Sequence, residues 1–228
     1  MIDLAVLDIA GTTVDEGGTV YRVLASVVAD HAGPVSDDTI RRWMGADKRE
    51  ALAALTGRDR DDVEALHAEF VTRLGEAYEA TPPVPLTGVP EALAALRSAG
   101  VKVALTTGFD RQVTDPLLAS VGWRLGDQLD AVVCASEVAG GRPRPHMIHR
   151  AMELTGAPTV RRVLVAGDTA LDVRAGIAAG AGFVVGVLTG AQTRTELAAE
   201  HPTHVLDGVA AIPALLGVGT DGALLGPS

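Results

Sequence analysis

Short apolar runs recur along the chain, and segments with helical periodicity separate most of them. Each run spans four or five residues, the length of a buried strand. The runs lie at residues 4–7, 101–105, 131–134, 163–166 and 183–187. Strands that alternate with helices pair as a parallel sheet whose two faces the helices cover. We therefore predict an α/β fold with a parallel sheet and helices on both faces.

The alternation is interrupted after the first run, where helical segments follow one another without a strand pattern between them. These segments begin near Val20, Ser36, Asp47 and Asp61. A proline-rich stretch at residues 81–85 then leads back to the alternating pattern. We predict a core domain of residues 1–14 and 86–228, with an all-helical cap domain of residues 15–85 inserted into it.

Charge and cysteine content narrow the partners and the compartment. Lys and Arg total 19 against 29 Asp and Glu, and the resulting net charge of -10 opposes binding to nucleic acid. The single cysteine, Cys134, cannot form an internal disulfide, which is typical of a reducing compartment. No apolar stretch reaches transmembrane length. We expect a cytoplasmic protein without nucleic-acid or membrane partners, and the oligomeric state is open, with a homodimer among the options.

Polar residues follow several of the predicted strands, at the edge where open α/β sheets bind ligands. Asp8 ends the first run, where a carboxylate can be a nucleophile, a metal ligand or a cap for the next turn. Thr106-Thr107-Gly108 ends the second run and can bind an anion or form an ordinary turn. Asp168 and Asp172 follow the fourth run, and their spacing puts both on one face of a helix, suited to a hard cation or to the helix N-terminus.

A fourth segment, Gly141-Arg142-Pro143-Arg144-Pro145, has two prolines that stiffen the approach to a helix. Arg142 can present its guanidinium to a phosphate there, or it can be a solvated surface arginine. Taken in chain order, these four segments resemble the haloacid dehalogenase-like hydrolase superfamily, whose members carry an Asp nucleophile, a Thr or Ser, a Lys or Arg, and an acidic pair. The resemblance spans nearly the whole chain.

This resemblance implies a Rossmann-like core, an inserted helical cap, an aspartyl-phosphate intermediate and Mg²⁺ as the cofactor. It implies that Asp8 is the nucleophile. The residues expected to bind phosphoryl oxygens are Arg142 and Thr106 or Thr107. The residues expected to hold the metal are Asp8, Ala10 through its carbonyl, Asp168, and Asp172, which would orient the other ligands. The residues expected to contact the substrate are Gly11, Thr12, Met44, Gly108 and Phe109.

Ala10 stands where most phosphatases of the superfamily have a second Asp that protonates the leaving oxygen. Losing a general acid typically costs about 10²–10⁴ in rate. Either the leaving group is not an alkoxide, therefore, or the acid comes from elsewhere. The stretch from Asp8 to Asp15, Asp-Ile-Ala-Gly-Thr-Thr-Val-Asp, is similar to that of the phosphonatase branch, the phosphonoacetaldehyde hydrolases. That branch has Ala at the same place and cleaves a carbon–phosphorus bond.

The segment Met44-Gly45-Ala46-Asp47-Lys48 is similar to the Met-Gly-x-x-Lys pattern of that branch, in which the lysine forms a Schiff base with the substrate aldehyde. By this resemblance Lys48 is a catalytic residue. Its amine would need a lowered pKa, from burial on cap closure or from a cationic neighbour such as Arg49 or Arg142. The alternatives are that Lys48 grips an anionic substrate, or that it is solvated in the first turn of a helix.

Three positions depart from the phosphonatase branch: Gly18, Ala51 and Phe109 stand where it has Cys, His and Tyr. The leading hypothesis is a magnesium-dependent, phosphonatase-like hydrolase that cleaves phosphonoacetaldehyde or a related carbonyl phosphonate. One alternative is a phosphomonoester phosphatase that acts on a small metabolite and tolerates Ala10. Another is a catalytically idle protein that binds phosphate.

Overall fold

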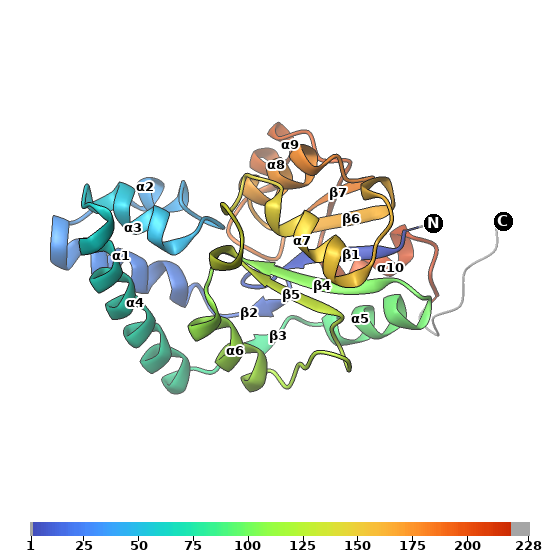
Figure 1. Cartoon of the computed structure of the whole chain (residues 1–228), viewed down its shortest axis with the longest axis horizontal. Helices are drawn as coiled ribbons and strands as arrows, with labels where there is room; N and C mark the ends of the chain where they lie inside the picture. Colours follow the sequence, from blue (N-terminus) through green and yellow to red (C-terminus); the bar gives the residue numbers. More distant parts are fainter. Residues whose placement is uncertain (1, 220–228) are drawn as a thin grey trace.

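A computed structural model describes residues 2–219 (Figure 1). Within these residues one parallel sheet has the strand order β5-β4-β1-β6-β7-β8. The strands are β1 (Leu4–Asp8), β4 (Lys102–Thr107), β5 (Ala131–Cys134), β6 (Val163–Gly167), β7 (Phe183–Val187) and β8 (His204–Leu206). Each of the five predicted runs corresponds to a strand, and only the run at residues 101–105 begins one residue before its strand, β4. The strand β8 was not predicted, because it is half-buried and has only three residues and no continuous apolar run.

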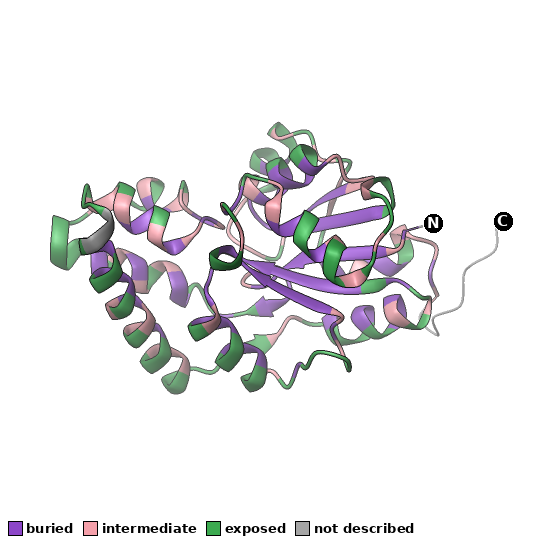
Figure 2. Ribbon diagram, in the orientation of Figure 1, coloured by how far each residue is buried: buried purple, intermediate pink, exposed green. Residues whose placement is uncertain are grey.

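Helices cover both faces of the sheet, which confirms the predicted fold class (Figure 2). Leu4 and Val6 of β1 pack in one apolar cluster with α7 (His146–Thr155) and α8 (Ala170–Ala179). Ala5 and Leu7 point to the opposite face, because side chains alternate along a strand. That face packs against α5 (Val89–Ser98), α6 (Arg111–Ser120) and α10 (Ile212–Leu215).

The first four helices of the chain lie together beside the sheet, at the left in Figure 1. They are α1 (Thr19–Ala32), α2 (Asp37–Arg41), α3 (Lys48–Thr56) and α4 (Arg60–Ala80). Two of these helices start where capping chemistry predicts: the Ser36 side chain accepts the Thr39 N–H at the start of α2, and Asp47 accepts the N–H groups of Arg49 and Glu50 at the start of α3.

Two short strands, β2 (Val14–Asp15) and β3 (Val84–Pro85), pair antiparallel where the chain leaves and re-enters the core. The sequence analysis found no strand here, because two residues carry no periodic pattern. The domain boundaries at residues 14/15 and 85/86 stay a prediction, and residues 220–228 of the predicted core lie outside the described part.

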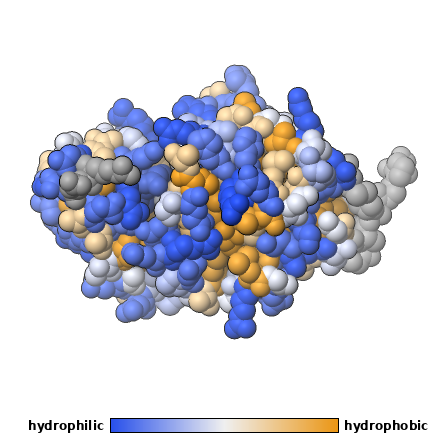
Figure 3. Space-filling view, in the orientation of Figure 1, coloured by the Kyte–Doolittle hydropathy of each residue, from blue (hydrophilic) through white to orange (hydrophobic). Residues whose placement is uncertain are grey.

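The remaining elements are short. They are α9 (Arg194–Ala199) and the 3₁₀ turns η1 (Ala135–Glu137), η2 (Val160–Arg162) and η3 (Val209–Ala211). Among residues 2–219 there is no helix with the length and apolar composition that a membrane span requires. The face in Figure 3 is mostly hydrophilic, and its apolar side chains gather near the middle of the view.

Candidate active site

Three neighbouring strands bring the candidate residues to one edge of the sheet. β1 lies between β4 and β6, and Asp8 at its end is in register with Thr106 of β4. Asp168 follows the end of β6. The turn after Asp8 is tight, because the Ile9 carbonyl accepts N–H groups from the next turn and Gly11 has a left-handed φ of 83°. Parallel topology therefore assembles this edge from residues far apart in the chain.

A small cavity of about 20 Å³ lies at this edge, between the core and the cap. Its lining residues are Asp8, Ala10, Val20, Tyr21, Gly45, Lys48, Thr107, Gly108, Phe109, Arg142, Asp168 and Thr169. Of the predicted site residues, Gly11, Thr12, Met44, Thr106 and Asp172 are not in the lining. A space of this size holds about one water molecule, so a substrate can enter only when the cap moves away from the core.

Arg142 is the centre of the polar network and is 4% exposed, which excludes the solvated-arginine alternative. Its Nη1 lies 2.7 Å from Oδ1 of Asp8, and its Nε lies 2.7 Å from Oδ1 of Asp172. Its Nη2 donates to the hydroxyl oxygen of Thr106 at 2.8 Å and to the Thr106 carbonyl at 2.9 Å. The Thr106 hydroxyl is therefore engaged with Arg142, and Thr107 is the hydroxyl that borders the cavity.

Two buried carboxylates at this edge repel each other. Burial raises the pKa of Asp8 to about 6, and Arg142 opposes that rise. Burial and the charge of Asp8 raise the pKa of Asp168 well above its ordinary value. The Thr12 hydroxyl donates to Oδ1 of Asp168 at 2.9 Å, so Thr12 orients this carboxylate rather than bordering the cavity. A side chain in place of Gly190 would overlap the other oxygen of Asp168.

The donor set suits a hard divalent cation. The carboxylates of Asp8 and Asp168, with the Ala10 carbonyl, supply the oxygen ligands that Mg²⁺ prefers, and a cation would relieve the repulsion between the two acids. Oδ1 of Asp172 pairs with Arg142, and Oδ2 accepts a hydrogen bond from the Thr169 hydroxyl at 2.5 Å. Both carboxylate oxygens of Asp172 are therefore engaged, which fits its predicted role of orienting the other ligands. The described residues contain no cluster of three His, Cys, Asp or Glu side chains, so water and substrate oxygens would complete the coordination.

Lys48 is buried at the start of α3, which excludes the solvated-lysine alternative. Its Nζ donates to the Ala46 carbonyl at 2.8 Å and lies 5.4 Å from the centroid of the Phe109 ring. Burial, with a smaller contribution from Arg142, lowers the pKa of Lys48 to about 8, although the nearby carboxylates oppose the shift. Arg49, named above as a cationic neighbour, instead directs its Nε to Glu64 at 2.8 Å.

The sequence analysis missed cavity residues on α1 and at the start of α8. Val20 and Tyr21 belong to α1, and Val20 counted only as part of a helical apolar pattern. Burial and the charges of the site carboxylates raise the pKa of Tyr21 well above its ordinary value, so its hydroxyl stays protonated. Among the three departures from the phosphonatase branch, Phe109 lines the cavity, whereas Gly18 and Ala51 do not.

Comparison with known proteins also indicates a hydrolase. A sequence profile of haloacid dehalogenase-like hydrolases matches residues 2–180. The chain is 32% identical over 206 residues to a phosphonoacetaldehyde hydrolase from Hahella chejuensis, covering 82% of this chain and 68% of that protein. It is 31% identical over 205 residues to a phosphonoacetaldehyde hydrolase from Bacillus cereus, covering 83% of this chain and 76% of that protein.

A solved structure has the same fold. It is a phosphonoacetaldehyde hydrolase-like protein from Oleispira antarctica, which superposes with a TM-score of 0.82 at 20% identity. The match covers 98% of this chain and 94% of that one. The core and the cap are therefore both shared with it.

Proposed function

Because the chain belongs to the haloacid dehalogenase-like hydrolase family, we propose that it is a magnesium-dependent phosphonatase acting on phosphonoacetaldehyde or a related carbonyl phosphonate. One observation carries this proposal: the buried amine of Lys48 borders the same cavity as Asp8, while Ala10 supplies no acid there. A lysine with a pKa of about 8 is suited to imine formation, because an appreciable fraction is neutral near neutral pH. The phosphonoacetaldehyde hydrolase relatives support the same substrate class.

The substrate is a small anion, and the site's positive groups would bind it. Arg142 lines the cavity, and its Nη1, whose contact with the Gly45 carbonyl is 3.3 Å long, can bind a phosphonate oxygen once the cap moves away. The Thr107 hydroxyl and the backbone N–H groups that follow it can bind another phosphonate oxygen. Because the whole chain has a net charge of -10, nucleic acid is not a partner in this proposal, and neither is a membrane.

The first chemical step makes carbon a viable leaving group. The neutral Lys48 amine adds to the aldehyde carbonyl, and uptake of one proton from solvent with loss of water gives a protonated imine. A carboxylate oxygen of Asp8 then attacks phosphorus, the carbon–phosphorus bond breaks, and its electron pair flows into the imine to form an enamine. Protonation of the enamine carbon and hydrolysis release acetaldehyde and free Lys48.

The second step returns the nucleophile. Water attacks the aspartyl-phosphate at phosphorus, phosphate leaves, and the Asp8 carboxylate is restored, so the sum is phosphonoacetaldehyde plus water to acetaldehyde plus phosphate. Asp8, Asp168 and the Ala10 carbonyl would hold Mg²⁺, which supplies neutralisation of the phosphoryl charge. Arg142 keeps Asp8 oriented throughout, through the ion pair at 2.7 Å.

The test is a product assay with phosphonoacetaldehyde and Mg²⁺, in which phosphate and acetaldehyde are measured together. The proposal requires that both appear in equal amounts. A panel of phosphomonoesters is run in parallel. Phosphate from the esters without acetaldehyde from the phosphonate would instead identify a phosphatase, and tight phosphate binding without any turnover would identify a binding protein.

Ala10→Asp is expected to exchange one activity for the other. The new carboxyl group lies two residues beyond the nucleophile, where it can protonate an ester oxygen, so phosphomonoesterase activity should rise by up to about 10²-fold. Carbon–phosphorus cleavage should fall, because the carboxylate adds negative charge beside an anionic substrate. Both activities are measured on the same preparation, with Ala10→Ser as the control for crowding. Fast ester hydrolysis by the wild type that Ala10→Asp does not improve would contradict the proposed role of Ala10.

The pH dependence of kcat/KM is expected to report Lys48. Imine formation needs the neutral amine, so kcat/KM should rise with pH and level off above about 8, the pKa to which burial lowers Lys48. Relative to a lysine with the ordinary value of 10.5, this shift enlarges the neutral fraction at pH 7 by about 300-fold. Rates are measured between pH 6.5 and 9 (about the range in which the amine titrates). A flat profile across that range would rule out Lys48 as the titrating group.

A further inference from the structure

Three polar side chains form a cluster between the cap and the core, beside the cavity. We call it the Asp110 cluster, and its members are Arg49, His67 and Asp110. Oδ2 of Asp110 lies 3.2 Å from Nη1 of Arg49 and 3.5 Å from Nε2 of His67. Asp110 and His67 are buried, so water screens these contacts less than it screens a surface ion pair. The cluster therefore joins two cap helices, α3 and α4, to the start of α6 in the core.

The Asp110 cluster is directly connected to the proposed imine-forming group. Lys48 and Arg49 are consecutive residues at the start of α3, and Phe109 and Asp110 are consecutive residues before α6. The same two backbone segments therefore make two adjacent contacts. Nζ of Lys48 lies over the Phe109 ring, and the next residue of each segment, Arg49 and Asp110, forms the ion pair. Because neighbouring Cα atoms are about 3.8 Å apart, a shift of one contact moves the other.

The other ion pairs between cap and core are more exposed. Arg41 pairs with Glu196 at 3.0 Å, and Arg144 pairs with Glu50 at 3.2 Å. All four of these side chains are more than one-third exposed. Exposed ion pairs contribute little, because water screens them. Another buried polar contact across this boundary, from Arg142 to the Gly45 carbonyl at 3.3 Å, belongs to the catalytic network itself.

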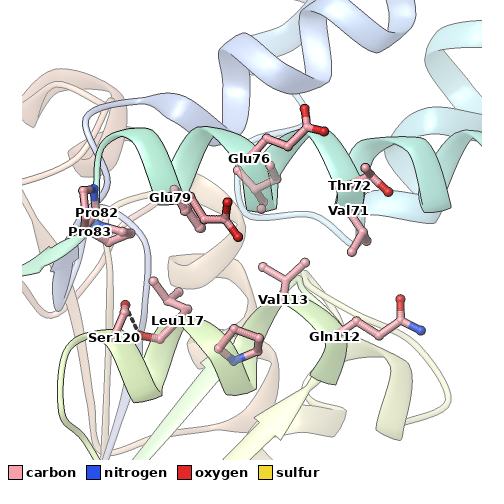
Figure 4. Close-up of a pocket in the computed structure, with 14 residues that line it drawn as sticks. Val71, Thr72, Glu76, Glu79, Pro82, Pro83, Gln112, Val113, Leu117 and Ser120 are labelled. Carbon is pink, nitrogen blue, oxygen red and sulfur yellow. Dashed lines mark hydrogen bonds between the residues drawn. The ribbon is translucent and has the colours of Figure 1, made fainter.

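The helices that the Asp110 cluster joins separate farther along. A groove of about 650 Å³ lies between the carboxyl-terminal half of α4 and α6, with Glu76 and Glu79 on one side and Leu117 and Ser120 on the other (Figure 4). The polar connection between α4 and α6 is thus made at the amino-terminal end of α6. The cluster is placed where it can govern how closely the cap approaches the Phe109 segment.

We propose that Asp110 is a positioning residue that ties the cap to the core through Arg49 and His67. This tie keeps the cap closed with Lys48 held over the Phe109 ring and away from water. The role assigned to Lys48 rests on the proposed function, whereas the tie itself does not.

Asp110→Asn tests the contact with Arg49 and His67 without removing the N-cap of α6. Oδ1 of Asp110 accepts the Val113 N–H at 3.4 Å as the N-cap of α6, and an Asn side chain can make the same bond. The change therefore removes the negative charge that faces Arg49 and leaves α6 capped. The matched control is Asp115→Asn, which removes a carboxylate from the same helix, where it pairs with Arg111 and has no cap partner.

The measurement is the pKa of Lys48, determined by competitive labelling with trace acetic anhydride across pH and read peptide by peptide. The chain has only two lysines, and the exposed Lys102 serves as the internal reference. The charged groups that face Lys48 are Asp47 on its own turn, Asp8 and Arg142 in the core, and Glu16 before α1. Asp110→Asn leaves all of them in place.

The expected result is a rise of the Lys48 pKa by about one unit or more toward its ordinary value, because a loosened cap admits water. Loss of the Asp110 charge alone would shift the pKa downward, so the sign distinguishes positioning from direct electrostatics. Asp115→Asn should leave the pKa unchanged. Arg49→Met should raise the pKa as well, and the double variant should add nothing, because both changes break one contact. An unchanged or lowered Lys48 pKa in Asp110→Asn would overturn the inference.

Phosphonoacetaldehyde turnover is measured on the same variants. We expect kcat/KM to fall by about 10-fold in Asp110→Asn, with its pH profile shifted to higher pH, since less amine is neutral. If the wild type releases no acetaldehyde, the proposed function fails, but the labelling result still decides whether Asp110 closes the cap over Lys48. If turnover is present and both the labelling and the pH profile are unchanged in Asp110→Asn, the tie fails and the proposed function stands.

Discussion

Asp8→Asn is expected to lower the proposed turnover of phosphonoacetaldehyde by about 10⁴-fold or more, the size of effect that removal of a covalent nucleophile has. The amide keeps the shape of the side chain, but its oxygen cannot attack phosphorus as a carboxylate does. It also removes one of the two anionic groups suited to hold Mg²⁺. The measurement is the release of phosphate at saturating substrate, with thermal unfolding followed in parallel.

Two observations make Asp8→Asn a decisive test. The carboxylate is buried and bonded to Arg142, so the thermal unfolding curve is needed to separate loss of chemistry from loss of stability. Asp130→Asn is the matched control, because Asp130 also forms ion pairs with a neighbouring Arg and Lys but lies away from the cavity. Activity above a few per cent of the wild type, on the order of an assay background, would show that another group attacks phosphorus.

Lys48→Arg is expected to lower the proposed carbon–phosphorus cleavage by about 10³-fold or more, because a guanidinium keeps the positive charge but cannot form an imine. Carbon is not a leaving group unless its electron pair can enter a protonated C=N bond. Borohydride added during turnover should inactivate the wild type and leave a reduced adduct on the peptide that contains Lys48. The release of acetaldehyde and phosphate is measured with and without borohydride.

The composition of the chain supplies an unusually clean control for this experiment. Lys102, the other lysine, is exposed and pairs with Asp130, and Lys102→Arg should leave both turnover and inactivation unchanged. In the Lys102→Arg background Lys48 is the one remaining lysine, so an adduct is assigned without ambiguity. If Lys48→Arg cleaves the phosphonate as fast as the wild type, Lys48 serves to grip the anion and the imine mechanism is wrong.

Strand positions were predictable because burial on both faces leaves a continuous apolar signal. The runs that became β1, β4, β5, β6 and β7 all have that signal, and the helices between them carry the complementary periodicity. The strands β2, β3 and β8 were not predicted, because two or three residues are too few to show a hydrophobic pattern. Such short strands pair because the tertiary structure places their backbones side by side.

The sequence by itself determined which chemical groups meet at the sheet edge. Asp8, Thr107 and Asp168 each follow a buried strand, and parallel pairing brings the carboxyl ends of neighbouring strands together whatever the loops do. This is why the pattern of residues at strand ends, read with the family resemblance, predicted the nucleophile and the acidic pair of a hydrolase before any contact was known. Local sequence also predicted the starts of the cap helices, through Ser36 and Asp47.

The tertiary structure alone decided how the cap meets that edge. Burial of Lys48, which lowers its pKa to about 8, depends on contacts with the core that no local pattern encodes. The same holds for the placement of Tyr21 in the cavity and for the ion pair between Arg49 and Asp110, residues 61 positions apart. Desolvation and ion pairing act over a few ångströms in space, and only the packing of one domain against the other sets those distances.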